Sequence, residues 1–183
     1  CKVQTNRTGH VKRGATEIED GFSVEVLQEG QGLTILGTTI NLDDPTKFEI
    51  QNRIALGWRM FWAMGKLLQC PKISRRKRLQ VFDTTVGSSV LYGTESWTPR
   101  KEELHSLESA RRSMLRRIAG TKRTQSQTWV EWMHLSTSTA FKHVDQAGVR
   151  HCGEYHYERK WLRAGHVARR PEESWIWKVT TWR

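Results

Sequence analysis

Apolar and polar positions follow two different periods along the chain, and the period changes near residue 44. Phe22, Val24 and Val26 alternate with polar residues, and the run 33–42 is rich in Thr, Ile and Leu. A period of two is typical of β-strands, and residues 29–32 between the two runs include two glycines suited to a turn. The pattern predicts a β-hairpin formed by these two runs.

After residue 44 the apolar positions recur every three or four residues, which is typical of amphipathic helices. The first predicted helix begins at Asp44-Pro45, because proline suits the first helical turn. Thr46 and Glu49 have the spacing of a capping box. Pro71 ends this helix.

Three more helices are expected, over 74–92, from Thr98-Pro99 to Gly120, and over 155–170. Residues 121–154 are polar and irregular, and predict a linker with a short helix around 129–135. The expected fold class is α+β, mainly α. Its expected parts are a hairpin region (1–44), a helical bundle (45–120), a polar linker (121–154) and a less ordered helical segment with a Trp-rich tail (155–183).

The charge of the chain is strongly positive and unevenly distributed. Thirty Lys and Arg against nineteen Asp and Glu give a net charge of +11 over 183 residues. Residues 1–49 carry five basic and eight acidic side chains, so the excess lies in the remainder. A strongly basic segment of this length favours binding to polyanions, which means nucleic acid or an anionic membrane surface.

No membrane or secretory segment is expected. The longest uncharged run, 30–42, has thirteen residues, whereas a spanning helix needs about 20 apolar ones. Three widely spaced cysteines, Cys1, Cys70 and Cys152, support neither a disulfide framework nor a Cys-x-x-Cys zinc site. We expect an intracellular protein, nuclear or cytoplasmic and not secreted. Because the chain begins with Cys rather than Met, we also expect a fragment.

Four consecutive cations occupy the first turn of the second predicted helix, where they oppose the helix macrodipole. Each costs roughly 0.3–1 kcal/mol when exposed, so a sequence selected for stability alone would place acids there. Two interpretations stay open, a solvated charged turn and a turn that contacts phosphates. The residues are Arg75, Arg76, Lys77 and Arg78.

The third predicted helix has an apolar face and an opposite face of Arg, Ser and His. After Glu102 the outer face carries no acid, whereas ordinary solvated helices mix both signs. The pattern therefore predicts a surface for a polyanion that continues past Gly120. Its cations are Arg112, Arg116, Arg117, Lys122 and Arg123.

Arg111 is the exception on this helix. At 100° per residue it projects into the apolar sector. We expect it to snorkel or to pair with Glu108, one turn earlier, and to serve structure rather than binding.

No self-contained active site is recognised in the sequence. Asp43 and Asp44 resemble the paired carboxylates on which polymerases hold metal ions, but such a site needs a further carboxylate, and helix entry already explains Asp44. His151, Cys152 and His156 are metal-ligand types without a fourth ligand at finger-like spacing, so a chance cluster is the better interpretation. No metal or cofactor is expected in this chain.

Five sequence blocks follow one another in order over about 135 residues. The blocks are Leu36-Gly37 with Ile40, Glu49-Ile50-x-x-Arg53-Ile54, Leu91-Tyr92-Gly93-x-Glu95-x-Trp97, Leu107-Glu108-x-Ala110 through Met114-Leu115-Arg116-Arg117-Ile118-x-Gly120, and Trp161-Leu162-x-Ala164-Gly165-His166-Val167-Ala168-Arg169. Together they resemble the C-terminal half of LINE-type, non-LTR retrotransposon reverse transcriptases. The short segment 2–6 also resembles the one that follows the family's catalytic YxDD hairpin.

The resemblance implies the end of a palm domain in 1–44 and a helical thumb in 45–120 that holds an RNA–DNA hybrid or RNA. The family's metal-binding aspartates would precede Cys1, so Mg²⁺ is expected for the parent polymerase and this chain alone would be inactive. The palm and fingers of the parent would be its missing partners.

Two other hypotheses stay open. The chain could be a structural or protein-binding remnant of a mobile element, whose exposed Trp and Arg residues mark an interface. It could also fail to fold stably, because a palm edge without its sheet exposes unpaired strand.

Overall fold

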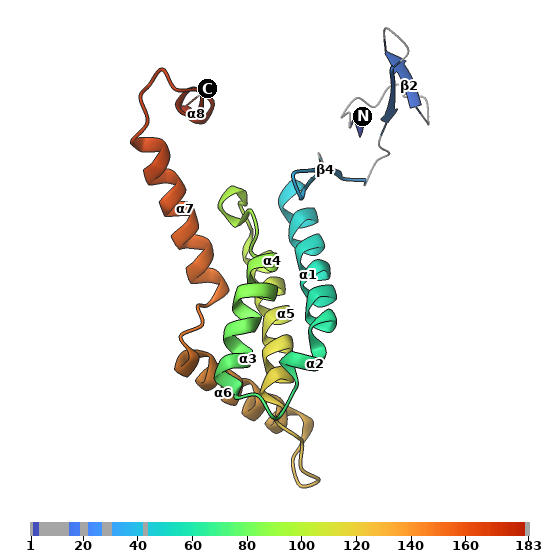
Figure 1. Cartoon of the computed structure of the whole chain (residues 1–183), viewed down its shortest axis with the longest axis vertical. Coiled ribbons are helices and arrows are strands. Elements are labelled where there is room, and N and C mark those ends of the chain that lie inside the picture. Colours follow the sequence, from blue (N-terminus) through green and yellow to red (C-terminus); the bar gives the residue numbers. More distant parts are fainter. Residues whose placement is uncertain (1, 4–14, 19–21, 27–30, 42–43, 182–183) are drawn as a thin grey trace. The chain divides into compact units, whose positions relative to one another are not determined.

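The computed structural model describes residues 2–3, 15–18, 22–26, 31–41 and 44–181, and the fold is α+β and mainly helical, as predicted (Figure 1). Strands occupy the N-terminal part and helices the rest. The chain forms two compact units, residues 1–55 and 56–183, and the boundary falls within helix α1 (Pro45–Ala63).

The strands form two separate sheets. In the first, β3 (Phe22–Val26) lies between β1 (Lys2–Val3), to which it is parallel, and β2 (Ala15–Ile18), to which it is antiparallel. The second sheet is a hairpin of β4 (Leu33–Ile35) and β5 (Thr38–Ile40). The predicted pairing of 22–26 with 33–42 is therefore wrong.

The hairpin lies within 33–40 because Leu36 and Gly37 make its turn. Their φ angles are 50° and 79°, and positive φ at both central residues characterises the type I′ turn, which matches the twist of paired strands. Leucine rarely adopts this conformation, so the sequence did not mark the turn. Residues 29 and 30 of the predicted turn lie outside the described part of the chain.

Helix α1 begins at Pro45, directly after Asp44, as the Asp44-Pro45 pair predicted, but its cap differs from the prediction. Asp44 Oδ1 accepts a hydrogen bond from the Lys47 backbone N–H at 3.2 Å, which satisfies a free donor of the first turn. The predicted capping box of Thr46 and Glu49 is wrong, because the Glu49 carboxylate is buried and bonded elsewhere.

Glu49 and Arg53 connect α1 to the β4–β5 hairpin. Glu49 Oε2 accepts from the Thr39 N–H at 2.6 Å, and Glu49 Oε1 accepts from Arg53 Nε at 2.6 Å. Arg53 Nη2 donates to the Gly37 carbonyl. A Cβ at Gly32 would lie 2.4 Å from Thr39 Cγ2, so the chain needs glycine where it passes this hairpin.

The second unit is helical. After α1 come α2 (Gly65–Leu68) and a continuous helical segment of α3 (Arg75–Phe82), a π-helical turn (Asp83–Gly87) and α4 (Ser88–Val90), close to the predicted helix over 74–92. A 3₁₀ turn (Thr94–Ser96) leads to α5 (Lys101–Ala119), which ends as predicted at Gly120 with φ of 67°. The remaining helices are α6 (Trp129–Ala147), α7 (Cys152–Ala168) and α8 (Trp175–Thr181).

Helix α6 corrects the prediction of a polar linker in 121–154. Thr128 and Glu131 form a capping box, with Thr128 N–H to Glu131 Oε2 at 2.8 Å and Glu131 N–H to Thr128 Oγ1 at 3.2 Å. The helix buries mainly small residues, Ser136, Ala140, Val144 and Ala147, so its apolar face was hidden among Ser and Thr. The predicted helix over 155–170 exists as α7.

The core of this unit lies between α3, α5 and α6. Helix α5 packs on α6 and on α3, and α6 also contacts α3 (Figure 1). Helix α1 approaches α4 and α5 closely at Gly57, where a Cβ would lie 2.3 Å from Val90 Cγ2 and 3.5 Å from Met114 Cε. The fully buried core side chains include Phe61, Phe82, Val86, Leu107, Met114, Leu115 and Ile118.

No helix in the described part of the chain is both long enough and apolar enough to cross a membrane.

Candidate nucleic-acid interface

The outer side of α5 carries three arginines in its last two turns. Arg116 is half-buried, and its Nη2 donates to Ser113 Oγ at 3.0 Å while Nη1 donates to Thr137 Oγ1 on α6 at 3.3 Å. Burial lowers the pKa of Arg116, and the nearby charges of Arg112 and Arg117 lower it further. Arg112 and Arg117 therefore each repel Arg116, and an anion bound between these cations would reduce the repulsion.

Arg117 contacts aromatic rings of α1. Its guanidinium carbon lies 5.7 Å from the ring centroid of Trp58 and 5.2 Å from that of Trp62. The two indoles are one helical turn apart, with centroids at 6.1 Å and an interplanar angle of 23°. The sequence prediction of the site omitted both tryptophans, because only the packing of α1 beside α5 brings them to Arg117.

The basic turn at the start of α3 has two different parts. Arg75, Arg76 and Lys77 are exposed, and Arg75 Nη1 lies 3.2 Å from His143 Nε2 on α6. Arg78 is buried, and its guanidinium donates to three backbone carbonyls, of Ile73 at 3.1 Å, Leu68 at 3.1 Å and Ile118 at 2.9 Å.

Arg78 is therefore a structural residue, which corrects its prediction as a phosphate ligand. Leu68 and Ile118 lie in the last turns of α2 and α5, where carbonyls have no partner within the helix. Burial, and then the charge of Arg75, lower the pKa of Arg78. Its bond to Ile118 also places the first turn of α3 against the last turn of α5, so the two basic clusters lie at the same end of the bundle.

Lys122 and Arg123 are exposed in the loop that leaves this end. The loop is held in place because Arg123 Nε donates to the Gln127 carbonyl at 3.0 Å and Trp132 Nε1 donates to the Thr121 carbonyl at 3.0 Å. The structure thus brings eight of the nine predicted cations to accessible positions on α3, α5 and the following loop. We call these eight residues, which come from α3, α5 and the following loop, the α5 end. They are Arg75, Arg76, Lys77, Arg112, Arg116, Arg117, Lys122 and Arg123.

Arg111 points inward, as predicted, but its partners differ from the expected Glu108. Arg111 donates to the Arg150 carbonyl and to Cys152 Sγ at 3.4 Å, and its Nη2 lies 3.7 Å from Asp83 Oδ1. Glu108 Oε1 instead accepts from the Gly153 N–H at 3.3 Å. Both side chains therefore fix the start of α7 against α5.

The His and Cys residues near 151–156 also have structural contacts. Cys152 is buried, which raises the pKa of its thiol to about 11. His156 is buried, and its Nδ1 lies 2.7 Å from Thr94 Oγ1. No group of three or more His, Cys, Asp or Glu that could hold a metal ion occurs within the described ranges, and Asp43 lies outside them.

Comparisons with known proteins give one similarity. No protein-family model matches the chain, and no solved structure matches it. The chain is 30% identical over 149 residues to an uncharacterized transposon-derived protein of Caenorhabditis elegans. The match covers 81% of this chain and 50% of that protein, so the chain spans about half the length of this curated relative. The similarity indicates a mobile-element origin.

Proposed function

We propose that the chain is part of a mobile-element reverse transcriptase and that its helical unit binds an RNA–DNA duplex, or RNA, through the phosphates. The observation that carries this proposal is the α5 end, which carries exposed or half-buried cations from three segments and in which Arg112 and Arg117 lie close enough to Arg116 to lower its pKa. The transposon-derived relative is consistent with a mobile-element enzyme.

The charge pattern supports a polyanion as the ligand. Residues 50–82 contain eight basic residues and no acid, and this segment supplies most of α1 and the whole of α2 and α3. Like-charged neighbours destabilise a surface unless an anion lies between them. Phosphates would fill this role without any reading of the base sequence.

The arrangement on rigid helices suits a duplex. A protein that holds a template–primer must grip it at every sequence, so it needs cations and small polar groups at fixed positions. Arg116 is fixed by Ser113 and Thr137, and Arg117 by two indole rings. The resemblance to the LINE-type thumb gives the same assignment.

Catalysis is not proposed for this chain. In the family, Mg²⁺-binding aspartates of the palm carry the polymerase reaction, and the blocks of this chain that resemble the family do not include them. The helical unit would contribute the positioning of the hybrid to the parent enzyme. The palm and fingers of the parent enzyme would be its partners. The protein would act inside the cell.

A salt titration tests the proposal. Contacts with four to six phosphates make the logarithm of the affinity fall against the logarithm of salt with a slope of about −4 to −5. Fluorescence anisotropy with a labelled RNA–DNA hybrid measures this slope directly. A slope near zero would contradict phosphate binding.

A triple variant locates the contacts. Arg112→Gln, Arg116→Gln and Arg117→Gln together should weaken binding at least tenfold and reduce the slope by about 2 to 3, because three phosphate contacts are lost. The matched control removes the same charge from the exposed residues Arg163, Arg169 and Lys178 on α7, α8 and the segment between them. Equal losses in both triple variants would indicate general attraction by net charge instead of a site.

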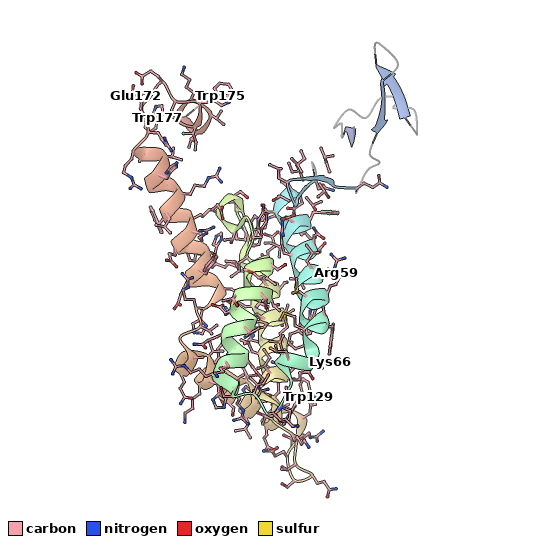
Figure 2. All side chains as sticks on the ribbon, in the orientation of Figure 1. Arg59, Lys66, Trp129, Glu172, Trp175 and Trp177 are labelled. Carbon is pink, nitrogen blue, oxygen red and sulfur yellow. The ribbon has the colours of Figure 1, made fainter. Side chains whose placement is uncertain are left out.

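A second candidate function is protein binding by a non-catalytic remnant. It is favoured by two exposed tryptophans of the C-terminal helices, Trp161 on α7 and Trp175 on α8, which are 76% and 79% exposed. Figure 2 shows Trp175 on α8. Exposed aromatic residues are typical anchors of interfaces. Under this alternative the α5 triple variant leaves hybrid binding unchanged, and Trp161→Ala with Trp175→Ala abolishes association with the partner.

A further inference from the structure

Helices α1 and α2 present a tryptophan between two exposed cations. Trp62 is 53% exposed, although it is a large aromatic residue. Arg59 and Lys66 are both exposed (Figure 2). They lie three residues before Trp62 and four after it, and this spacing places all three side chains on one helical face. Helical spacing therefore groups an indole and two cations on one side of the unit.

The indole of Trp62 is held in position. The fully buried Phe61 meets it edge to face, with centroids 5.3 Å apart and an interplanar angle of 83°. Trp58 lies nearly parallel to it, and the Arg117 guanidinium lies 5.2 Å from its centroid. The side chain is thus both ordered and half accessible, and it adjoins the α5 end through Arg117.

An ordered indole flanked by cations is suited to unpaired nucleotides. Proteins that bind single strands combine cations along the backbone with aromatic rings on which bases stack. Bases inside a duplex already stack on their neighbours, so an indole face can reach only an unpaired base or a duplex end. No acid occurs among residues 50–82, so nothing in this segment repels phosphates.

We propose that Trp62 stacks on an unpaired base of the bound nucleic acid, next to the duplex held at the α5 end, while Arg59 and Lys66 contact the adjoining phosphates. The inference rests on the proposed function and names a further part of the ligand, a single-stranded extension of the hybrid. None of these three residues was among the nucleic-acid-binding residues predicted from the sequence.

Two hybrids separate this inference from simple duplex binding. One is a blunt RNA–DNA hybrid, and the other is the same hybrid with a short single-stranded RNA extension. Trp62→Ala should lower the affinity for the extended hybrid at least fivefold, as expected for loss of one base–aromatic stack. It should weaken binding of the blunt hybrid much less, because no phosphate-binding side chain is removed and Arg117 keeps its contact with Trp58.

Two further variants serve as controls. Trp62→Phe keeps a stacking ring and should retain most of the affinity for the extended hybrid. Trp161→Ala removes an exposed tryptophan from α7 and should change neither affinity. Thermal melts check that each variant is folded.

The possible failures are distinguishable. If the wild-type chain binds neither hybrid, the proposed function fails and the inference fails with it. If the α5 triple variant abolishes binding but Trp62→Ala changes nothing, or weakens both hybrids equally, the stacking inference alone is overturned.

Discussion

At the scale of single residues, the buried guanidinium of Arg78 donates hydrogen bonds to backbone carbonyls at the ends of α2 and α5, which have no partner within their own helices. It bonds three carbonyls, from α2, from the segment before α3, and from α5. A cation next to helix C-termini also interacts favourably with the macrodipole. One side chain thus joins the end of α5, 40 residues away in the sequence, to α2 and to the segment just before α3.

Arg78→Gln should destabilise the fold by about 2 to 3 kcal/mol, because buried carbonyls lose a charged donor. Urea unfolding followed by circular dichroism measures the change in unfolding free energy. The matched control is Arg76→Gln, which removes an exposed cation of the same turn and should stay within about 0.5 kcal/mol of wild type. Equal losses in the two variants would contradict a structural role for Arg78.

His156 makes the stability depend on pH. Burial, and then the charge of Lys160, lower the pKa of His156 in the folded state, and only its contact with Thr94 opposes this. Below the ordinary histidine pKa of about 6.5 the unfolded chain therefore binds more protons than the folded one. Stability should fall as the pH drops from about 6.5 toward the lower folded value.

Thermal melts between about pH 7.5 and pH 5 test this expectation. His156→Gln keeps a polar group beside Thr94 but cannot titrate, so its melting temperature should fall less on acidification than that of wild type. His105→Gln, which changes an exposed histidine of α5, should keep the wild-type pH response. A wild-type response in His156→Gln would exclude this residue as the cause.

For single residues, the sequence predicted whether a side chain points inward or outward better than it predicted which groups that side chain contacts. Helical phase alone placed Arg111 inward, and it is 6% exposed. The contacts of Arg111 with Asp83 and Cys152 could not be predicted, because the three residues meet only when α5, α7 and the π-helical turn pack together. Arg78 was misassigned for the same reason.

At the scale of elements, the approach of α1 to α4 depends on Gly57. Gly57→Ala would place a methyl group 2.3 Å from Cγ2 of the buried, β-branched Val90. Overpacking costs about 1–3 kcal/mol, and the better helix propensity of alanine offsets up to about 1 kcal/mol of it. We expect a net destabilisation of about 1–2 kcal/mol in chemical denaturation.

Gly65→Ala is the matched control, because a Cβ there meets no atom closer than Gln69 Nε2 at 3.7 Å. It should leave stability unchanged or raise it slightly. Val90→Ala added to Gly57→Ala should recover part of the loss, since it removes the clashing methyl group. Additive losses in the double variant would exclude the clash as the cause.

Helices with a wide apolar face were predictable, and helices that bury small residues were not. Both α1 and α5 contain large apolar residues at helical spacing, and Gly120 marks the end of α5. Helix α6 buries Ser136 and Ala140, and the serine hydroxyl is satisfied by the Met133 carbonyl at 3.1 Å. Its strong local signals are the Thr128–Glu131 capping box at its start and Gly148, with φ of 70°, at its end.

At the scale of the whole molecule, positive charge is a property of the helical unit. The sequence identified the cations of α3 and α5, but only the packing of their ends places them together, through the bond of Arg78 to Ile118. It could not identify Trp58 and Trp62 as neighbours of Arg117, because that contact joins residues far apart in the chain. Composition predicts a polyanion as the ligand, and this stays a prediction, whereas tertiary contacts decide which cations lie near one another.

The buried Cys152 at the start of α7 is a built-in reporter of local opening. With its thiol pKa raised to about 11 and its side chain covered, it should resist thiol reagents while α7 stays docked. In a chain carrying Cys1→Ser and Cys70→Ser, the rate of labelling by an aromatic disulfide should therefore equal the rate at which α7 detaches. Arg111→Gln should accelerate labelling at least tenfold, and labelling as fast as in denaturant would mean that α7 is not docked in solution. The same kinetics, repeated with nucleic acid bound, would tell whether the ligand closes or loosens this helix.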